Sequence, residues 1–365
     1  MTANALDRTT AGLRRAADPP RSGGRLLPLV IGLVVLLACS VLAGIALGPV
    51  NLPLSQVLRI LDAEIRGGVI PASEEGPYRI ITQLRLPRVL LGAIVGAGLA
   101  TVGVAVQACV RNALADPYIL GISSGASVGA TAVTTLGIFA GLGLYALSVA
   151  AFLSALVATA LVYLAANGRS GLTPLRLVLT GTAMAYGFSA ITTLLVFRAP
   201  HGEAARSALF WLLGSLAGAN WASVPIAGIV VLLGIGYFAV RARRLNALSM
   251  GDEAAITLGV HATRFRRELF AVSAALTGVL VAVSGAIGFV GLLLPHVVRM
   301  LVGADHRRVL AIAPLAGACF LVWVDLAART LAAPEELPIG VLTAVLGVPF
   351  FVLLMRRRGY VFGGR

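Results

Sequence analysis

Apolar residues occur along this chain in long runs that short polar connections separate. A helix that crosses the hydrocarbon core of a bilayer needs about 20 mostly apolar residues. Ten runs approach or reach that length, at residues 26–48, 89–109, 118–137, 143–166, 176–197, 222–241, 268–288, 289–303, 309–328 and 338–355. The run 289–303 is short and contains Pro295, so we expect a tilted or partly spanning helix there. The pattern predicts an all-α, polytopic membrane protein of about ten transmembrane helices.

The arginines between these runs predict how the chain is oriented. If residues 1–25 form a cytoplasmic tail and the helices alternate in direction, 20 arginines fall on the inner side and 8 on the outer side, leaving out Arg299 within a helix. Positive residues concentrate on the cytoplasmic side of membrane proteins. We therefore expect a transmembrane domain over 26–358 in the cell membrane, with the connection 242–267 and the C-terminal tail 359–365 also in the cytoplasm.

Composition narrows the classes of protein that this chain can belong to. It is 58% hydrophobic and 12% charged, whereas a soluble domain is about 25% charged. Soluble enzymes and nucleic-acid-binding domains are therefore excluded. All 29 basic residues are arginines, so the lysine of a phosphate-binding P-loop is missing. We expect the chain to bind no cofactor, and any ATP and Mg²⁺ that drive it to sit on partner subunits.

The cysteines bear on whether the chain binds a metal, and the glycines on how its helices pack. Cys39, Cys109 and Cys319 lie in apolar runs without the spacing of metal ligands, so we predict no metal site. Gly121 and Gly125 lie one helical turn apart. Small residues on one face let helices in lipid approach closely. Such a face serves close packing alone, or it also lines a path through the membrane, and the sequence leaves both readings open.

The connection 242–267 contains a short segment that is suited to contact another protein. Gly251 and Gly259 flank the sequence Glu253-Ala254-Ala255 within residues 245–259. A short helix with small side chains can sit in a groove of a partner, because little bulk separates the two backbones. The segment resembles the Glu-Ala-Ala and Gly pattern with which ABC importer permeases contact their ATPases.

Further motifs occur in the order found in one family. They are Leu84–Arg88, Gln107, Arg111–Pro117, Gly121–Ala126, Phe289–Leu292, Pro295-His296, Arg299, Asp305–Arg307, Asp325 with Arg329, and Glu336–Gly340. Together they resemble the FecCD family, the permeases of type II ABC importers for iron-siderophores, haem and vitamin B12. The resemblance implies a ten-helix bundle like that of the vitamin B12 importer permease. It also implies a second permease subunit as homodimer or close heterodimer, two ABC ATPase subunits, an extracytoplasmic substrate-binding protein, and no nucleic acid.

The resemblance also assigns roles to individual residues at the outer side. Arg85, Arg88 and Arg329 match positions at which the family's arginines receive acidic residues of the binding protein. For Arg85 and Arg88 the alternative is an interaction with lipid headgroups. Asp325 and Arg329 are four residues apart, so we also expect them to pair on one helix face.

Two further sets of residues are candidates for the transport pathway. Thr173, Pro174 and Leu175 occupy the inner turn where related permeases have their cytoplasmic gate. The second set is the glycine and serine cluster at the start of the third predicted span. Its members are Gly121, Ser123, Ser124 and Gly125.

The sequence thus favours a transport subunit without its own ATPase site, powered by separate ATPases. Among cargoes we expect an iron-siderophore, because this metal chelate is frequent in the family, with cobalamin or haem as alternatives. An ion-coupled secondary transporter would need carboxylates near the bilayer midplane, and Asp325 has Arg329 beside it. An intramembrane enzyme would need a metal-binding cluster or a Ser/His pair on facing helices, and neither is evident in the sequence.

Overall fold

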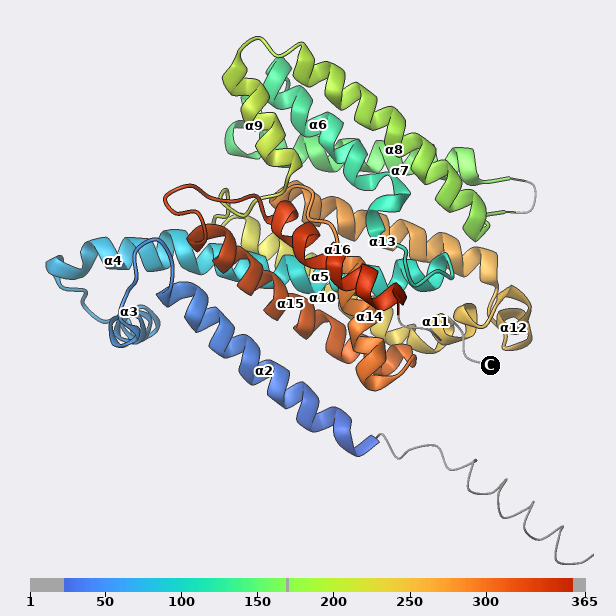
Figure 1. The fold of residues 1–365 in the computed structure, drawn as a ribbon, viewed down its shortest axis with the longest axis horizontal. Coiled ribbons are helices and arrows are strands. Elements are labelled where there is room, and N and C mark those ends of the chain that lie inside the picture. Colours follow the sequence, from blue (N-terminus) through green and yellow to red (C-terminus); the bar gives the residue numbers. More distant parts are fainter. Residues whose placement is uncertain (1–22, 169–170, 357–365) are drawn as a thin grey trace, which may run out of the picture.

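The computed structural model describes residues 23–168 and 171–356. The predicted C-terminal tail and all but the last three residues of the predicted N-terminal tail lie outside this part. Within it the protein is all-α and polytopic, and most of its long helices run in roughly the same direction (Figure 1). Seven helical segments of the described chain are long and apolar enough to cross a membrane.

Each of the ten predicted spans contains a helix in the described residues. They are α2 (Gly23–Ala46), α5 (Leu86–Cys109), α6 (Ile122–Leu136), α7 (Ala146–Ala166), α8 (Pro174–Phe197), α10 (Ser223–Val240), α13 (Ala262–Ser284), α14 (Val290–Val302), α15 (His306–Thr330) and α16 (Ile339–Arg356). Helix α14 has 13 residues with Pro295 inside it, so the predicted short helix is present. Helix α6 begins later than predicted, because Asp116 and Pro117 first start a 3-10 turn, η3 (Pro117–Leu120).

Shorter helices form the two ends of the bundle. One end carries α3 (Leu54–Arg66), α4 (Glu75–Arg79) and the π-helical turn η2 (Ile80–Arg85). We name it the α3 end, and it is the predicted external side. The other end carries α11 (Ala242–Ser249) and α12 (Asp252–Thr257), and we name it the α12 end. Figure 1 places these two ends at opposite sides of the molecule.

Helix α5 lies at the centre of the larger group of helices, where it packs against α10, α13, α14 and α15. Glycines permit the closest approaches. A Cβ on Gly103 would overlap the carbonyl of Gly291 in α14, and a Cβ on Gly96 would overlap the carbonyl of Gly317 in α15. Backbones that approach this closely gain dispersion contacts, which drive helix association in lipid.

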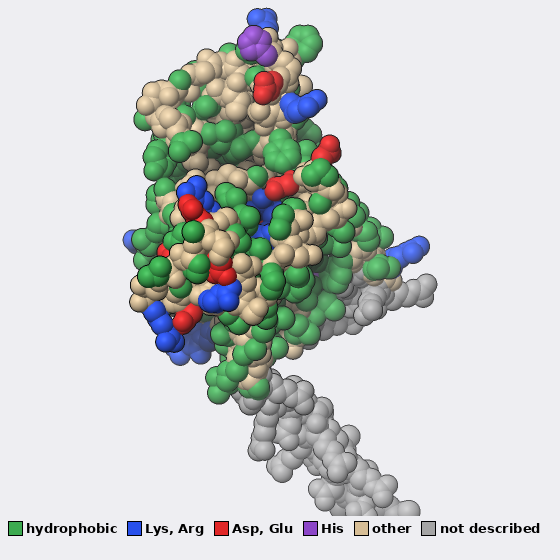
Figure 2. Space-filling view, turned by 90° about the vertical axis from the view of Figure 1, so that its left-hand side faces the viewer, with side chains coloured by type: hydrophobic (Ala, Val, Ile, Leu, Met, Phe, Trp, Pro, Cys, Tyr) green, Lys and Arg blue, Asp and Glu red, His purple; other side chains and the backbone are tan. Residues whose placement is uncertain are grey.

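The helices α6, α7, α8 and α9 (Gly202–Leu212) form a second group, drawn at the top of Figure 1. Helix α6 packs closely on α7, since a Cβ on Gly125 would overlap the Cβ of Ala158. Helix α13 joins the two groups by contacting α7 and α6. Seen from the α3 end, charged side chains are scattered over an otherwise apolar surface (Figure 2).

Candidate functional site

The predicted partner-contact segment forms a short helix at the α12 end. Gly251 has φ +118° immediately before α12, and Gly259 has φ +75° after it. Both values lie in the region that glycine adopts most readily. The alanine face points differently from our expectation, because Ala255 is buried against the protein itself. The contact role of the segment stays a prediction; of its small residues Gly259 is exposed and Ala254 is half-buried.

Larger side chains cover the exposed side of this segment. Glu253 is exposed, and Met250, Ile256 and Leu258 are 69%, 61% and 61% exposed. Apolar side chains gathered on a connecting segment are typical of a surface that contacts another protein. The segment therefore has a suitable surface for a partner, made of apolar residues and one glutamate.

Arg266 on α13 attaches this segment to the rest of the bundle. Its side chain is fully buried. The guanidinium donates from Nη2 to Oδ1 of Asp252 at 2.6 Å, from Nη1 to the carbonyl of Leu172 at 3.0 Å, and from Nε to the carbonyl of Cys109 at 3.1 Å. One side chain thus connects α12, the end of α5 and the turn that precedes α8.

That turn contains the predicted gate residues. Thr173 caps α8, since its Oγ1 accepts a hydrogen bond from the N–H of Arg176 at 3.4 Å, and Pro174 occupies the first helical position. Leu175 is 67% exposed. These three residues therefore lie at the α12 end, directly after Leu172, whose carbonyl Arg266 binds. Their gating role is untested by this geometry.

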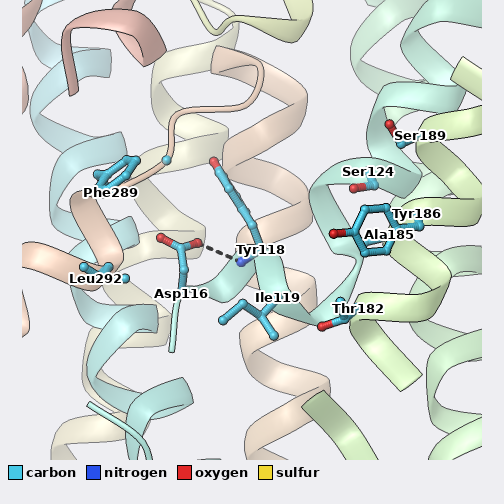
Figure 3. A pocket seen from close by; sticks show the side chains of 11 residues that line it. Asp116, Tyr118, Ile119, Ser124, Thr182, Ala185, Tyr186, Ser189, Phe289 and Leu292 are labelled. Atoms are coloured by element: carbon cyan, nitrogen blue, oxygen red, sulfur yellow. Dashed lines mark hydrogen bonds between the residues drawn. The ribbon is translucent and has the colours of Figure 1, made fainter. Parts of the chain in front are cut away.

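A cavity of about 480 Å³ lies between the two groups of helices. Figure 3 shows Asp116 and Tyr118 facing Ser124, Tyr186 and Ser189 across it. The remaining lining residues are Ile119, Thr182, Ala185, Gly288, Phe289 and Leu292. The cavity joins η3 and α6 to α8 and to the start of α14.

Hydrogen bonds fix the side of the cavity that η3 forms. Oδ1 of Asp116 accepts from the N–H of Tyr118 at 2.9 Å, so the carboxylate caps this turn. The hydroxyl of Tyr118 accepts from the N–H of Ile287 at 2.9 Å. Together these bonds hold the aromatic ring and the carboxylate in fixed positions beside the cavity.

Of the four glycine and serine candidates, Ser124 lines this cavity. Ser123 is buried beside it, and Gly121 has φ +75° where η3 meets α6. Gly125 packs on Ala158, so the packing interpretation holds for that residue. The sequence argument missed Thr182, Tyr186 and Ser189 of α8. Their spacing of four and three residues inside an apolar run was the available signal.

At the α3 end, Arg88 belongs to a network of ion pairs. Its Nε donates to Oδ1 of Asp325 at 2.9 Å, and its two terminal nitrogens donate to the carboxylate of Glu336 at 2.8 and 2.9 Å. Nε of Arg329 lies 3.0 Å from Oδ2 of Asp325. The predicted pairing of Asp325 with Arg329 is therefore confirmed, and Arg88 and Glu336 extend it.

Arg85 binds backbone carbonyls near the end of α2. It donates to the carbonyls of Ile45 at 2.6 Å and of Ala46 at 3.0 Å, and also to that of Val50. Ile45 and Ala46 belong to the last turn of α2, whose carbonyls have no partner within the helix, and Val50 follows it. Arg85 therefore closes the end of α2.

The three arginines do not form the exposed patch that we expected. Arg85, Arg88 and Arg329 are 6%, 9% and 4% exposed, and their guanidiniums contact groups of this chain. Neither a partner's carboxylate nor a lipid headgroup can reach them without displacing those contacts. The physical reason is that their guanidiniums already contact Asp325, Glu336 and backbone carbonyls at the end of α2.

Comparison with known proteins identifies the family of this chain. The sequence profile of the FecCD transport family matches residues 31–357. The chain belongs to the FecCD transport family. This FecCD permease is 44% identical to the cobalamin import system permease BtuC of Halobacterium salinarum over 280 residues, which is 76% of this chain and 74% of that one.

Other relatives carry different names. The permease is 38% identical to the Hemin transport system permease HmuU of Yersinia pestis over 92% of its own length and 98% of the relative's. It is 40% identical to the Fe(3+) dicitrate transport permease FecD of Escherichia coli over 77% and 86%. A solved structure described as an inward-facing metal-chelate type ABC transporter matches with a TM-score of 0.78 at 34% identity, over 90% of this chain and 98% of that one.

These matches define the class of this FecCD permease. It is a multi-pass membrane protein and a permease of the ABC importer type. Membership implies that it works in the plasma membrane together with ATPase and permease partners. Within the described residues, no group of three or more His, Cys, Asp or Glu side chains is placed to hold a metal ion.

Proposed function

We propose that this permease moves a ferric siderophore inward, powered by two separate ABC ATPase subunits and supplied by an extracytoplasmic binding protein. The observation that carries the proposal is the match to metal-chelate permeases over nearly the whole chain. Its relatives are named for cobalamin, hemin and ferric dicitrate. Cobalamin and haem are therefore the alternative cargoes.

We also propose that two copies of the permease form the pathway together, and the exposure of α8 supports this. Most of α8 is exposed, including Leu179, Tyr186 and Phe197, which are 60%, 76% and 85% exposed. The same helix contributes Thr182 and Ser189 to the cavity. Polar groups in a spanning helix favour a position inside a bundle or beside water over contact with lipid. A second copy that packs along α8 would enclose the cavity between the two subunits.

Arg266 supports a route by which an ATPase could act on this pathway. We propose that the ATPase contacts Glu253 and the apolar side chains around α12. Movement of α12 would then act through Asp252 and Arg266 on the carbonyl of Leu172 and the gate turn. Coupling of this kind requires an element with two arrangements that both sites influence. The start of α8 is our candidate for that element.

Uptake by the complete importer tests this function. The permease is produced with its own ATPase and binding protein in a strain that lacks siderophore, haem and cobalamin importers, and each radiolabelled chelate is supplied separately. We expect uptake of a ferric siderophore that vanadate blocks and a protonophore leaves largely intact. Uptake of cobalamin or haem alone would select one of the alternatives. Uptake that a protonophore abolishes and vanadate leaves intact would show an ion-coupled transporter instead.

A further inference from the structure

A second, smaller cavity lies at the α12 end, away from the pathway. It has a volume of about 300 Å³ and is lined by Arg244 of α11, residues 259–261, and Arg264, Phe265 and Glu268 of α13. This volume is too small for a metal chelate, but it can hold a phosphate group with the first atoms of its ester. Gly259 of the proposed ATPase-contact segment lies at its edge, but the arginines and the glutamate that line it have no role in the pathway or in that contact.

Positive charge exceeds negative charge around the cavity. Glu268 faces two arginines at distances longer than a hydrogen bond, with 3.9 Å to Nε of Arg241 and 3.7 Å to Nε of Arg264. In the part of the chain that the structure describes, Arg244 forms no ion pair and the buried Nε of Arg241 makes no hydrogen bond. Among the described lining residues Glu268 is the one carboxylate, against the lining arginines Arg244 and Arg264 and the neighbouring Arg241. Their remaining N–H groups suit an anion that has several acceptor oxygens.

The cavity begins where the lipid-facing surface of α10 ends. Leu233 and Val240 are 69% and 83% exposed on this apolar helix. Arg244 lies in α11, which begins directly after the turn at Arg241 that ends α10. Arg241 also lies over the ring of Tyr237, 4.0 Å from its centroid. Apolar residues followed by arginines and a tyrosine are typical of the level of lipid headgroups.

We propose that this cavity binds the phosphate of an anionic phospholipid. Arg244 and Arg264 hold the phosphate oxygens, and the acyl chains lie along the exposed face of α10. A basic pocket between helices at the membrane surface is a known form of lipid recognition. A free phosphate ion would share the same donors, but it would have no use for the adjacent apolar face. The site rests on α10 being a spanning helix, and the proposed orientation places it in the inner leaflet.

Lipid binding by the purified full-length permease tests the proposal without cargo or ATPase, so the result is independent of the transport function. Fluorescent phosphatidylglycerol is titrated into the permease in neutral detergent, and phosphatidylcholine serves as the comparison lipid. The test variant is Arg244→Gln with Arg264→Gln. The matched control is Arg307→Gln with Arg308→Gln, which removes the same charge at the same end. Thermal unfolding checks that both variants are folded.

We expect the test variant to bind phosphatidylglycerol about 30-fold more weakly, since an arginine near the surface contributes about 1 kcal/mol to binding an anionic lipid. The control should change this affinity by less than about threefold. Equal losses in the two variants would show unspecific attraction and overturn the proposal. Displacement of the lipid by millimolar inorganic phosphate would assign the cavity to the free ion. Unchanged lipid affinity together with loss of the copurifying ATPase would assign it to the ATPase interface.

Discussion

The guanidinium of Arg88 and the carboxylate of Glu336 form a two-pronged ion pair, although 248 positions separate them in the sequence. The pair joins the start of α5 to the connection between α15 and α16. Since Nε of Arg88 also binds the buried Asp325, this arginine holds three parts of the α3 end together. Of its two carboxylate partners, Asp325 is buried and Glu336 is partly exposed. Variants of this network can therefore distinguish a role of Arg88 in stability from a role in binding.

Replacing Arg88 should destabilise the permease far more than replacing Glu336. Arg88→Ala leaves Asp325 buried with Arg329 as its remaining partner, and breaking a buried ion pair in this way costs about 3–5 kcal/mol. Glu336→Gln removes a partner whose side chain is 32% exposed, so water can compensate and we expect a loss of about 1 kcal/mol or less. Thermal unfolding in detergent measures both. Similar small losses for the two variants would contradict a structural role for Arg88.

Glu336→Gln also tests whether the binding protein uses Arg88. If an acidic residue of the binding protein docks there, it must compete with Glu336 for the same N–H groups. Removing the charge of Glu336 should then accelerate association severalfold, more strongly at low than at high salt, because charge attraction mainly affects the association rate. Glu335→Gln is the control. The carboxylate of Glu335 lies next to Glu336 in the sequence but forms no ion pair within the described residues. Equal association rates for both variants would leave Arg88 with a purely structural role.

Gly259→Arg should abolish uptake and reduce the amount of ATPase that copurifies. A long charged side chain at this position would project from the segment that we expect the ATPase to contact. Gly67→Arg is a matched control at the opposite end of the bundle. Gly67 has φ +70° and Gly259 has φ +75°, and a Cβ meets no atom within 4 Å at either position. Backbone strain is therefore similar in both variants. Equal effects on copurification would attribute the defect to strain.

Arg266→Gln should separate ATP hydrolysis from transport. The shorter amide cannot reach Asp252, Leu172 and Cys109 together, so movement of α12 would no longer act on the gate turn. We expect the ATPase to remain bound and active while uptake falls at least tenfold. Asp252→Asn, which weakens one of the three bonds, should give an intermediate ratio of uptake to hydrolysis. A proportional fall of assembly, hydrolysis and uptake would show that Arg266 has a structural role alone.

Cysteine labelling should place the α12 end inside the cell. In a variant without Cys39, Cys109 and Cys319 that is produced without its ATPase, we expect Met250→Cys to be protected from an impermeant maleimide in intact cells and Gly76→Cys to react. Met250 suits this test better than Asp252, because Asp252 binds the buried Arg266. Both cysteines should react after the cells are opened. Reaction of Met250→Cys alone in intact cells would reverse the predicted orientation.

The spans could be predicted because a bilayer imposes a length and a composition that the sequence displays directly. The environment of single arginines could not be predicted in the same way. Arg264, Arg266 and Arg267 all belong to one basic stretch, yet Arg266 is fully buried. The helical period carried a signal for this burial, since Arg266 lies on the same face of α13 as the buried Phe270, Ser273 and Thr277.

Contacts between residues far apart in the sequence could not be predicted from helical periodicity. Glu336 became the partner of Arg88 through the packing of α5 against α15, and composition near Glu336 shows nothing of it. The polar face of α8 was visible as Thr182 and Ser189 inside an apolar run, but its opposite wall comes from Asp116 and Tyr118 in a turn that tertiary packing places there. Docking residues were assigned by resemblance alone, so their burial could be found only in the structure.

The central position of α5 also bears on how the protein is made. A chain is synthesised from its N-terminus, and the helices that contact α5 most extensively begin at Ser223 or later. For much of synthesis, the bare backbone at Gly96 and Gly103 therefore has none of its final neighbours. The close contacts with Gly317 and Gly291 can form only after α15 and α14 have entered the membrane. The close packing of α5 thus waits until the C-terminal half of the permease has been synthesised.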